Sequence, residues 1–338
     1  MKIFNASNSK FKIIDLSKTE NEFYISDKNY KYERVHKIRP FLEKYVRRCN
    51  FYTRDNLKIY YEKYINPKAD KAIVISHGMG ECTAKMEEVI YYFFKANYSV
   101  FIMDHRGHGN SEREIEDLTI IHIDNFEKYV LDFHEFIEKI VFKNYKDCYL
   151  YGHSMGGGIG AFFIEKYPDI FKKVVLTAPM IEMNTFIPKG LLKLIVKVGI
   201  INGENKHSIF PNYTFKSVED FQVFCSTCKI RASYYYSKVL MHKRYDTYGL
   251  SFDWLKSSLE GTFEIQQRKN MAKVKSKVLM FETEDDYLVK GKAMRRFAEG
   301  VSCAELIFVP NVKHELYNTY NDVMIPYFNT VFEFLNEE

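Results

Sequence analysis

The feature that most constrains the fold is a repeated alternation of strand-like and helix-like patterns from residue 51 onward. Short runs rich in β-branched and aromatic residues predict strands, and stretches with 3.6-residue spacing predict helices. The predicted strands are residues 57–64, 71–76, 98–104, 146–151, 172–179, 277–282 and 305–310, and the predicted helices are 83–96, 123–143, 156–167, 290–299 and one from about residue 319. This alternation is typical of an α/β fold with a mostly parallel central sheet and helices on both faces.

Residues 180–260 interrupt the alternation. The segment has helical and irregular patterns without a clear strand, and it is too long for an ordinary connection. Because strand and helix patterns resume after it, we expect a helical cap inserted into one core. The expected division is a core of residues 51–179 and 261–338, the cap or lid at 180–260, and a basic N-terminal extension at 1–50.

The N-terminal extension carries the charge imbalance of the chain. The whole chain has a net charge of +5, whereas residues 1–50 alone hold 12 Lys and Arg against 6 Asp and Glu. A basic arm of this kind suits peripheral contact with an anionic membrane surface, but a solvated and partly ordered segment has the same composition. We expect no nucleic-acid partner.

The cysteines and the first residues favour a cytoplasmic protein, peripheral at most to the inner membrane face. Residues 1–10 lack the apolar stretch and cleavage site of a secretory signal, and no run of about 18 apolar residues occurs. The cysteines are irregularly spaced, as expected for reduced thiols, at positions 49, 82, 148, 225, 228 and 303.

One serine lies between two glycines directly after a predicted strand. In the stretch YGHSMGGG (151–158), Gly152 and Gly156 flank Ser154 and suit a sharp turn in which a Cβ would clash. The helix predicted to follow directs its N-terminal N–H groups toward developing negative charge. The pattern G-x-S-x-G is common by chance, but between a strand and a helix it indicates a nucleophile.

A serine hydroxyl needs a base to remove its proton and a carboxylate to orient that base. In an open parallel sheet such groups gather at the carboxyl ends of strands. His314 follows the predicted strand 305–310, and four acids follow the strand before it, Glu282, Glu284, Asp285 and Asp286. Serine, acid and histidine therefore come in the chain order found in α/β-hydrolases.

Acyl transfer also needs donors for an oxyanion, commonly backbone N–H groups. We expect one from Met155, the residue after Ser154. The second is expected from Met79 in the turn HGMGE (77–81), where small Gly78 and Gly80 leave the Met79 N–H free to point into the site. A purely structural glycine turn is the alternative for this second position.

A metal site is not expected. Asp104, His105 and His108 lie together in DHRGHGNSE (104–112), but no further ligand with suitable geometry is evident. Cys225 and Cys228 form a single C-x-x-C pair, and zinc ribbons need two. We therefore expect no cofactor, and a loop packed beside the nucleophile at 104–112.

Taken together, HGMGE, DHRGHGNS, GHSMGGG and the tail containing KHE resemble the lysophospholipase and monoacylglycerol lipase branch of the α/β-hydrolases. The resemblance runs from about residue 50 to the end and includes two cap segments, RASYYY (231–236) and GLSFDWL (249–255). It implies an α/β-hydrolase fold and hydrolysis of a single acyl ester through an acyl-enzyme intermediate. Ser154 would be the nucleophile, His314 the base and an Asp the orienting acid.

Alignment on VLMFETEDDYLV (278–289) places that acid at Asp286, with Asp285 as the competitor. Three positions depart from the family pattern. Cys82 stands where the family often has His, and Glu112 and Thr283 stand where it often has Gly. The departures leave the triad intact, and they mean that the family's substrate-facing surface does not carry over to this chain on the resemblance alone.

The cap helix KGLLKLIVKVGII (189–201) bears on the substrate. Its lysines, Lys189, Lys193 and Lys197, are spaced four apart among apolar residues, which suits a helix at a lipid interface. A cap helix packed on the core with snorkelling lysines is the alternative. We expect a monoacyl lipid substrate, a lysophospholipid or monoacylglycerol. The alternatives are a smaller soluble ester or thioester, and a silent binding protein, which a broken triad would favour.

Overall fold

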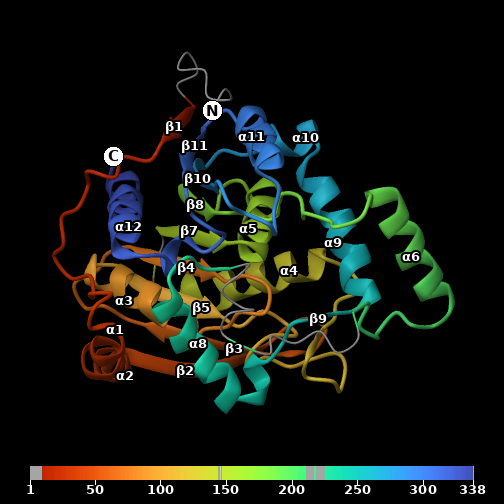
Figure 1. The fold of residues 1–338 in the computed structure, drawn as a ribbon, viewed down its shortest axis with the longest axis horizontal. Helices are drawn as coiled ribbons and strands as arrows, with labels where there is room; N and C mark the ends of the chain where they lie inside the picture. Colours follow the sequence, from red (N-terminus) through yellow and green to blue (C-terminus); the bar gives the residue numbers. More distant parts are fainter. Residues whose placement is uncertain (1–9, 144, 146, 211–216, 218–224, 338) are drawn as a thin grey trace.

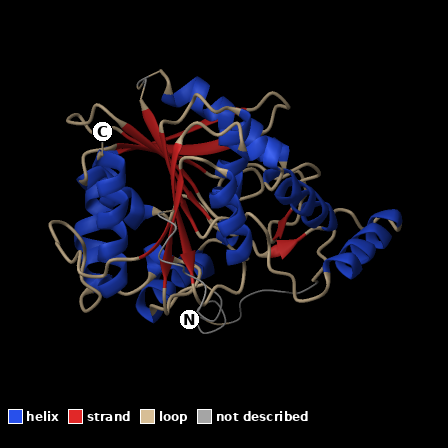
Figure 2. Ribbon diagram, turned by 90° about the horizontal axis from the view of Figure 1, so that it is seen from above, coloured by secondary structure: helices blue, strands red, loops and turns tan. Residues whose placement is uncertain are grey.

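A nine-stranded sheet forms the centre of the molecule (Figures 1 and 2). The computed structural model describes residues 10–143, 145, 147–210, 217 and 225–337. The strand order is β1 (Phe11–Ile13), β11 (Ala304–Val309), β10 (Lys277–Thr283), β8 (Lys173–Thr177), β7 (Cys148–His153), β4 (Ala72–Ser76), β5 (Ser99–Met103), β3 (Lys58–Tyr64) and β2 (Val46–Tyr52). Neighbours pair in parallel except at β5–β3 and β3–β2, so the expected mostly parallel sheet is confirmed.

Helices cover both faces of this sheet, each over its own apolar cluster (Figure 2). One face packs against α4 (Glu127–Phe136), α5 (Met155–Lys166), α9 (Phe252–Ile265) and α11 (Gly291–Gly300). The other packs against α3 (Glu87–Lys95) and α12 (Asn321–Asn336). Because the inner strands are buried on both faces, they read as continuous apolar runs such as AIVIS and SVFIM.

The N-terminal region differs from the expected extension. β1 pairs with β11 and β2 pairs with β3, so residues before the expected boundary at 51 belong to the sheet. α1 (Tyr30–Glu33) continues through a π-helical turn, Arg34–Ile38, into α2 (Arg39–Tyr45), and the segment buries Tyr30, Ile38 and Leu42 beside α3. The charge count did not reveal this, because most basic residues of the segment occupy exposed positions between the buried apolar ones.

The segment 180–260 contains α6 (Lys189–Ile201), α8 (Lys229–Met241), the short β9 (Gly249–Leu250) and most of α9 among its described residues. β9 pairs with β6 (Ile120–Ile121), a two-residue strand pair that no sequence pattern predicted. α9 crosses the expected boundary at residue 260, and its Ser257 hydroxyl donates to the Ile123 carbonyl near the start of α4. The division into core and cap stays a prediction, with its second boundary inside a helix.

Within the described ranges, no helix has the length and apolar character needed to cross a bilayer.

Candidate active site

Ser154 occupies a strained turn between β7 and α5. Its backbone has φ 52° and ψ −119°, a region that costs a residue other than glycine about 1–3 kcal/mol. A Cβ on Gly156 would clash with the Ser76 carbonyl oxygen, and a Cβ on Gly152 would lie 2.9 Å from the Gly156 oxygen. The two flanking glycines are therefore required by the close approach of the turn to β4 and to itself.

His314 and Asp286 meet beyond the carboxyl ends of β11 and β10. His314 Nδ1 lies 2.7 Å from Asp286 Oδ2, and both side chains are 3 % exposed. Asp286 Oδ1 accepts hydrogen bonds from the N–H groups of Leu288 (2.8 Å) and Val289 (3.1 Å), which fix the orientation of the carboxylate. Asp285 is exposed. The structure therefore brings His314 together with Asp286 and leaves Asp285 at the surface.

The second ring nitrogen of His314 remains available. His314 Nε2 is buried and has no hydrogen-bond partner among the described residues. The ring of His153, the residue before Ser154, lies with its centroid 4.9 Å from that of His314. The histidine thus stands beside the turn that carries Ser154, with one nitrogen held by a carboxylate and the other free to accept a proton.

The electrostatics of the pair favour a protonated imidazole facing a carboxylate. Burial by itself would lower the pKa of His314, but Asp286 and more weakly Glu315 and Glu81 raise that pKa above its ordinary value. Burial would raise the pKa of Asp286, but the charge of His314 and the two backbone donors lower it. Asp286 therefore stabilises the imidazolium that forms when His314 takes up a proton.

The turn after β4 lies against Ser154. A Cβ on Gly78 would come within 3.1 Å of the Ser154 Cβ, and Gly80 has a φ of 68°. The Gly78 N–H donates to Glu81 Oε2 at 2.6 Å, which closes the turn. Within the described residues, neither the Met79 N–H nor the Met155 N–H donates a hydrogen bond, so both are available to an oxyanion.

A buried charged cluster behind these groups escaped the sequence analysis. Glu81 Oε1 accepts from the Tyr317 hydroxyl (2.7 Å) and from Lys85 Nζ (2.9 Å). Lys85 Nζ also reaches Glu315 Oε1 at 2.5 Å, which ties the turn after β4 to the residue following His314. Glu81 and Lys85 are four positions apart in the sequence, a spacing that suggests an ion pair. The same spacing is typical of ion pairs on the exposed face of a helix, so it does not reveal that this pair is buried.

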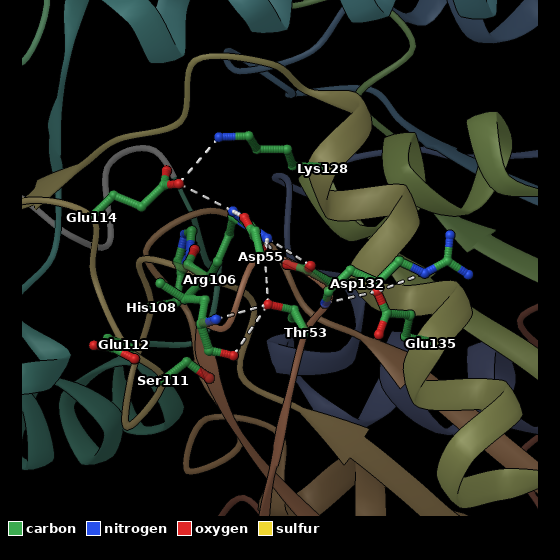
Figure 3. A network of polar contacts seen from close by, with 12 residues as sticks. Thr53, Asp55, Arg106, His108, Ser111, Glu112, Glu114, Lys128, Asp132 and Glu135 are labelled. Atoms are coloured by element: carbon green, nitrogen blue, oxygen red, sulfur yellow. Dashed lines mark hydrogen bonds and ion pairs between the residues drawn. The ribbon is translucent and has the colours of Figure 1, made fainter.

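The loop 104–112 is fixed beside the site by Arg106 (Figure 3). This buried guanidinium donates to both carboxylate oxygens of Asp132 in α4 (2.6 and 2.7 Å) and to Asp55 at 2.9 Å. Burial lowers the pKa of His108 to about 3, so the ring stays neutral. Within the described residues, no three side chains that bind metals are grouped to hold an ion.

The chain is similar to known hydrolases in sequence and in fold. The sequence model of a hydrolase family, Hydrolase_4, described as serine aminopeptidase S33, matches residues 67–320. The chain belongs to this family. The match contains Ser154, Asp286 and His314, whereas residues 10–66 with β1, α1, α2, β2 and β3 lie outside it.

Relatives within the family point to the same group of hydrolases. A probable lysophospholipase L2 from Haemophilus influenzae is 25% identical over 284 residues, covering 83% of this chain and 89% of that protein. Lysophospholipase L2 from Escherichia coli K12 is 32% identical over 143 residues, covering 41% of this chain and 42% of that protein. The resemblance drawn from the four motifs is thereby confirmed.

The fold is that of the α/β-hydrolases. A soluble variant of monoglyceride lipase from Saccharomyces cerevisiae, solved with a substrate analogue, superposes with a TM-score of 0.67 at 18% identity. The superposition covers 86% of this chain and 95% of that one. The fold class predicted from the alternating pattern is confirmed, and family membership makes the chain a hydrolase.

Proposed function

We propose that this protein is a serine hydrolase that cleaves the carboxylic ester of a monoacyl lipid, a lysophospholipid or a monoacylglycerol. The observation that carries the proposal is the buried His314–Asp286 pair, whose imidazole has a free Nε2 and lies 4.9 Å, centroid to centroid, from the ring of His153, the residue before Ser154. The relatives named lysophospholipase and the structural likeness to a monoglyceride lipase support the lipid class.

The proposed reaction proceeds in two steps at Ser154. His314 Nε2 takes the proton of the Ser154 hydroxyl while the oxygen attacks the ester carbonyl, and Asp286 stabilises the resulting imidazolium. The N–H groups of Met79 and Met155 hold the oxyanion, and His314 then gives its proton to the departing alcohol. Water, deprotonated by the same histidine, releases the fatty acid from Ser154 and restores the enzyme.

The experiment that tests the substrate class is a panel of four esters. We expect higher kcat/KM for lysophosphatidylcholine, lysophosphatidylethanolamine or monoolein than for a short p-nitrophenyl ester, because each buried CH₂ stabilises binding by about 0.8 kcal/mol. Free fatty acid or p-nitrophenol release is measured, and Ser154→Ala provides the background. A preference for the short ester would favour the alternative, an esterase or thioesterase for small soluble substrates.

The pH dependence follows from the pKa of His314. The base must be neutral, and its pKa lies above the ordinary 6.5, so the acidic limb of kcat/KM should have its midpoint above pH 6.5. Because the Asp286 carboxylate is what raises this pKa, Asp286→Asn should move the midpoint to lower pH. The kcat/KM for a short water-soluble ester, measured from pH 5 to 9, gives the midpoint for the wild type and for the variant. An identical midpoint in wild type and variant would contradict the assigned pair.

Contact with an anionic membrane surface completes the proposal, and α6 is the element that supports it. Figure 2 shows this helix standing away from the body of the molecule. Only Leu192, Val196 and Gly199 are buried in it. Its exposed apolar residues are Leu191, Leu194, Ile195, Val198 and Ile201, and Phe186 just before the helix is 85% exposed. Exposed Lys193 and Lys197 flank this surface, as in helices that lie in a lipid headgroup region.

We expect vesicles containing phosphatidylserine to bind the wild-type protein more weakly as salt rises, since screening weakens lysine–headgroup attraction. The double variant Leu194→Gln, Ile201→Gln should reduce binding roughly tenfold or more, because two large apolar side chains lose their burial in lipid. Leu240→Gln, at an equally exposed leucine on α8, is the matched control. Co-sedimentation measures the binding, and equal loss in the control, or no binding at low salt, would refute this contact surface.

A further inference from the structure

α8 covers the loops that carry the candidate site. The Tyr235 hydroxyl lies 3.8 Å from Cys82 Sγ, directly after the HGMGE turn, and Lys85 Nζ lies 5.1 Å from the centre of the Tyr235 ring. The apolar side of α8 forms a small separate cluster with Tyr248 and Leu288. Leu288 is one of the two residues whose N–H groups orient Asp286. The position of α8 therefore shapes the walls above both the oxyanion turn and the acid.

The N-terminal part of α8 is bound to the N-terminal segment of the chain. The Arg231 guanidinium of α8 is fully buried, pairs with Glu88 of α3, and donates to Asp27 at 2.9 Å and to Asn321 of α12 at 2.6 Å. It also lies 4.8 Å from the centre of the Tyr30 ring. Two residues of the N-terminal segment thus contact a charge that has no access to solvent.

A second set of contacts joins the same segment to the next turn of α8. The buried Arg34 guanidinium donates to Glu87 of α3 at 2.6 Å and lies 4.6 Å from the centre of the Tyr234 ring. The Tyr30 and Tyr234 rings meet edge to face at 5.7 Å, and the Tyr30 hydroxyl donates to Glu88 at 2.8 Å. Residues 27–34 are therefore held to α3, to α8 and, through the Asn321 N–H that donates to Asp27 at 2.7 Å, to α12.

Buried ion pairs tolerate displacement poorly, because two desolvated charges are compensated only when their geometry is good. Without Asp27, Tyr30 and Arg34, Arg231 would lose one of its two carboxylates and Tyr234 would lose both an aromatic and a cationic neighbour. These three residues lie outside the region that matches the family. The segment thus anchors the helix above the site from outside that region.

We infer that Asp27, Tyr30 and Arg34 are positioning residues, which hold α8 over the site loops and so determine how well a long-chain substrate fits. The inference rests on the proposed function, since it concerns the ester that reaches Ser154. The N-terminal segment would then affect substrate selection by holding α8 in place, and it would not contact the reacting atoms.

The test uses the full-length chain with Asp27→Asn or Arg34→Met. The KM for a long-chain monoacyl lipid should rise about 2- to 30-fold, the range found for residues that act through a packed network. The KM for p-nitrophenyl acetate should change much less, because a short acyl group does not need the wall formed by α8. Lys37→Met, an exposed residue three positions from Arg34, is the control and should match wild type in both assays. Arg34→Lys keeps a cation near Glu87 and Tyr234 and should recover part of the loss.

Hydrogen exchange of α8 amides separates this inference from the proposed function. Exchange in α8 should accelerate in Asp27→Asn and Arg34→Met and stay at the wild-type rate in Lys37→Met. Unchanged exchange in α8, or a rise in KM that is equal for long and short esters, would overturn the positioning role. A wild-type protein inactive on every ester would instead overturn the proposed function, while the exchange result would still decide the role of the segment.

Discussion

Replacing Ser154 by alanine is expected to lower turnover of a monoacyl lipid by about 10⁵-fold or more, as loss of a nucleophile does in other serine hydrolases. The acyl-enzyme cannot form without the hydroxyl, and His314 alone has no oxygen to activate. The variant should fold normally, because alanine occupies the same strained backbone with one atom fewer. Fatty acid release under saturating substrate measures the effect.

Ser302→Ala, at an exposed serine far along the chain, is the control for this substitution and should keep wild-type turnover. Circular dichroism and thermal midpoint establish that Ser154→Ala is folded. Turnover in Ser154→Ala within a factor of about ten of wild type would contradict the assignment, because the attacking group would then have to be one other than the Ser154 hydroxyl.

Asp286→Asn is expected to lower kcat by about 10⁴-fold, the loss seen when a triad carboxylate becomes an amide. Leu288 and Val289 donate to Asp286 Oδ1, which leaves Oδ2 to face the Nδ1–H of His314. An amide group there removes the negative charge that stabilises the imidazolium. It also favours the wrong tautomer of the ring, so His314 would no longer present a basic Nε2 to Ser154.

The neighbouring acid gives a matched control. Asp285 is exposed, and the carboxylate that contacts His314 is that of Asp286. Asp285→Asn should therefore leave kcat within about threefold of wild type, because substitutions of exposed side chains usually have small effects. Steady-state kinetics with one lipid and one short ester measure both variants. A large loss in Asp285→Asn beside a mild one in Asp286→Asn would transfer the role to Asp285 and contradict the observed pairing.

Much of the core could be predicted from the sequence, because a parallel sheet covered on both faces forces apolar runs separated by helical periods. The positions of Ser154 and His314 beyond the ends of strands could be predicted for the same reason, since each follows a strand whose pattern is clear. The choice between Asp285 and Asp286 is different. From residues alone both acids were candidates, and only the turn in which Asp286 accepts two backbone N–H groups turns its side chain inward.

Features that depend on pairing between distant segments could not be predicted. Arg34, Arg231, Glu81 and Lys85 are buried among partners that lie 53 to 236 positions away in the sequence, apart from contacts within the turn that contains Glu81 and Lys85. A charged residue by itself predicts a surface position, so the sequence did not reveal this burial. β1 has three residues and β9 two, which is too short for an alternating pattern. The N-terminal segment was therefore interpreted from its charge, although its buried residues attach it to the sheet and to α8.

The most direct measurement of the central claim is the site of covalent labelling by a fluorophosphonate. The probe reacts with a serine activated by a neighbouring base, and it reports this chemistry without assuming which ester is the natural substrate. Peptide mass spectrometry of the labelled wild-type protein should place one adduct on Ser154, and labelling should disappear in Ser154→Ala and slow greatly in His314→Ala. An adduct on another residue, or equal labelling of Ser154→Ala, would contradict the proposed mechanism.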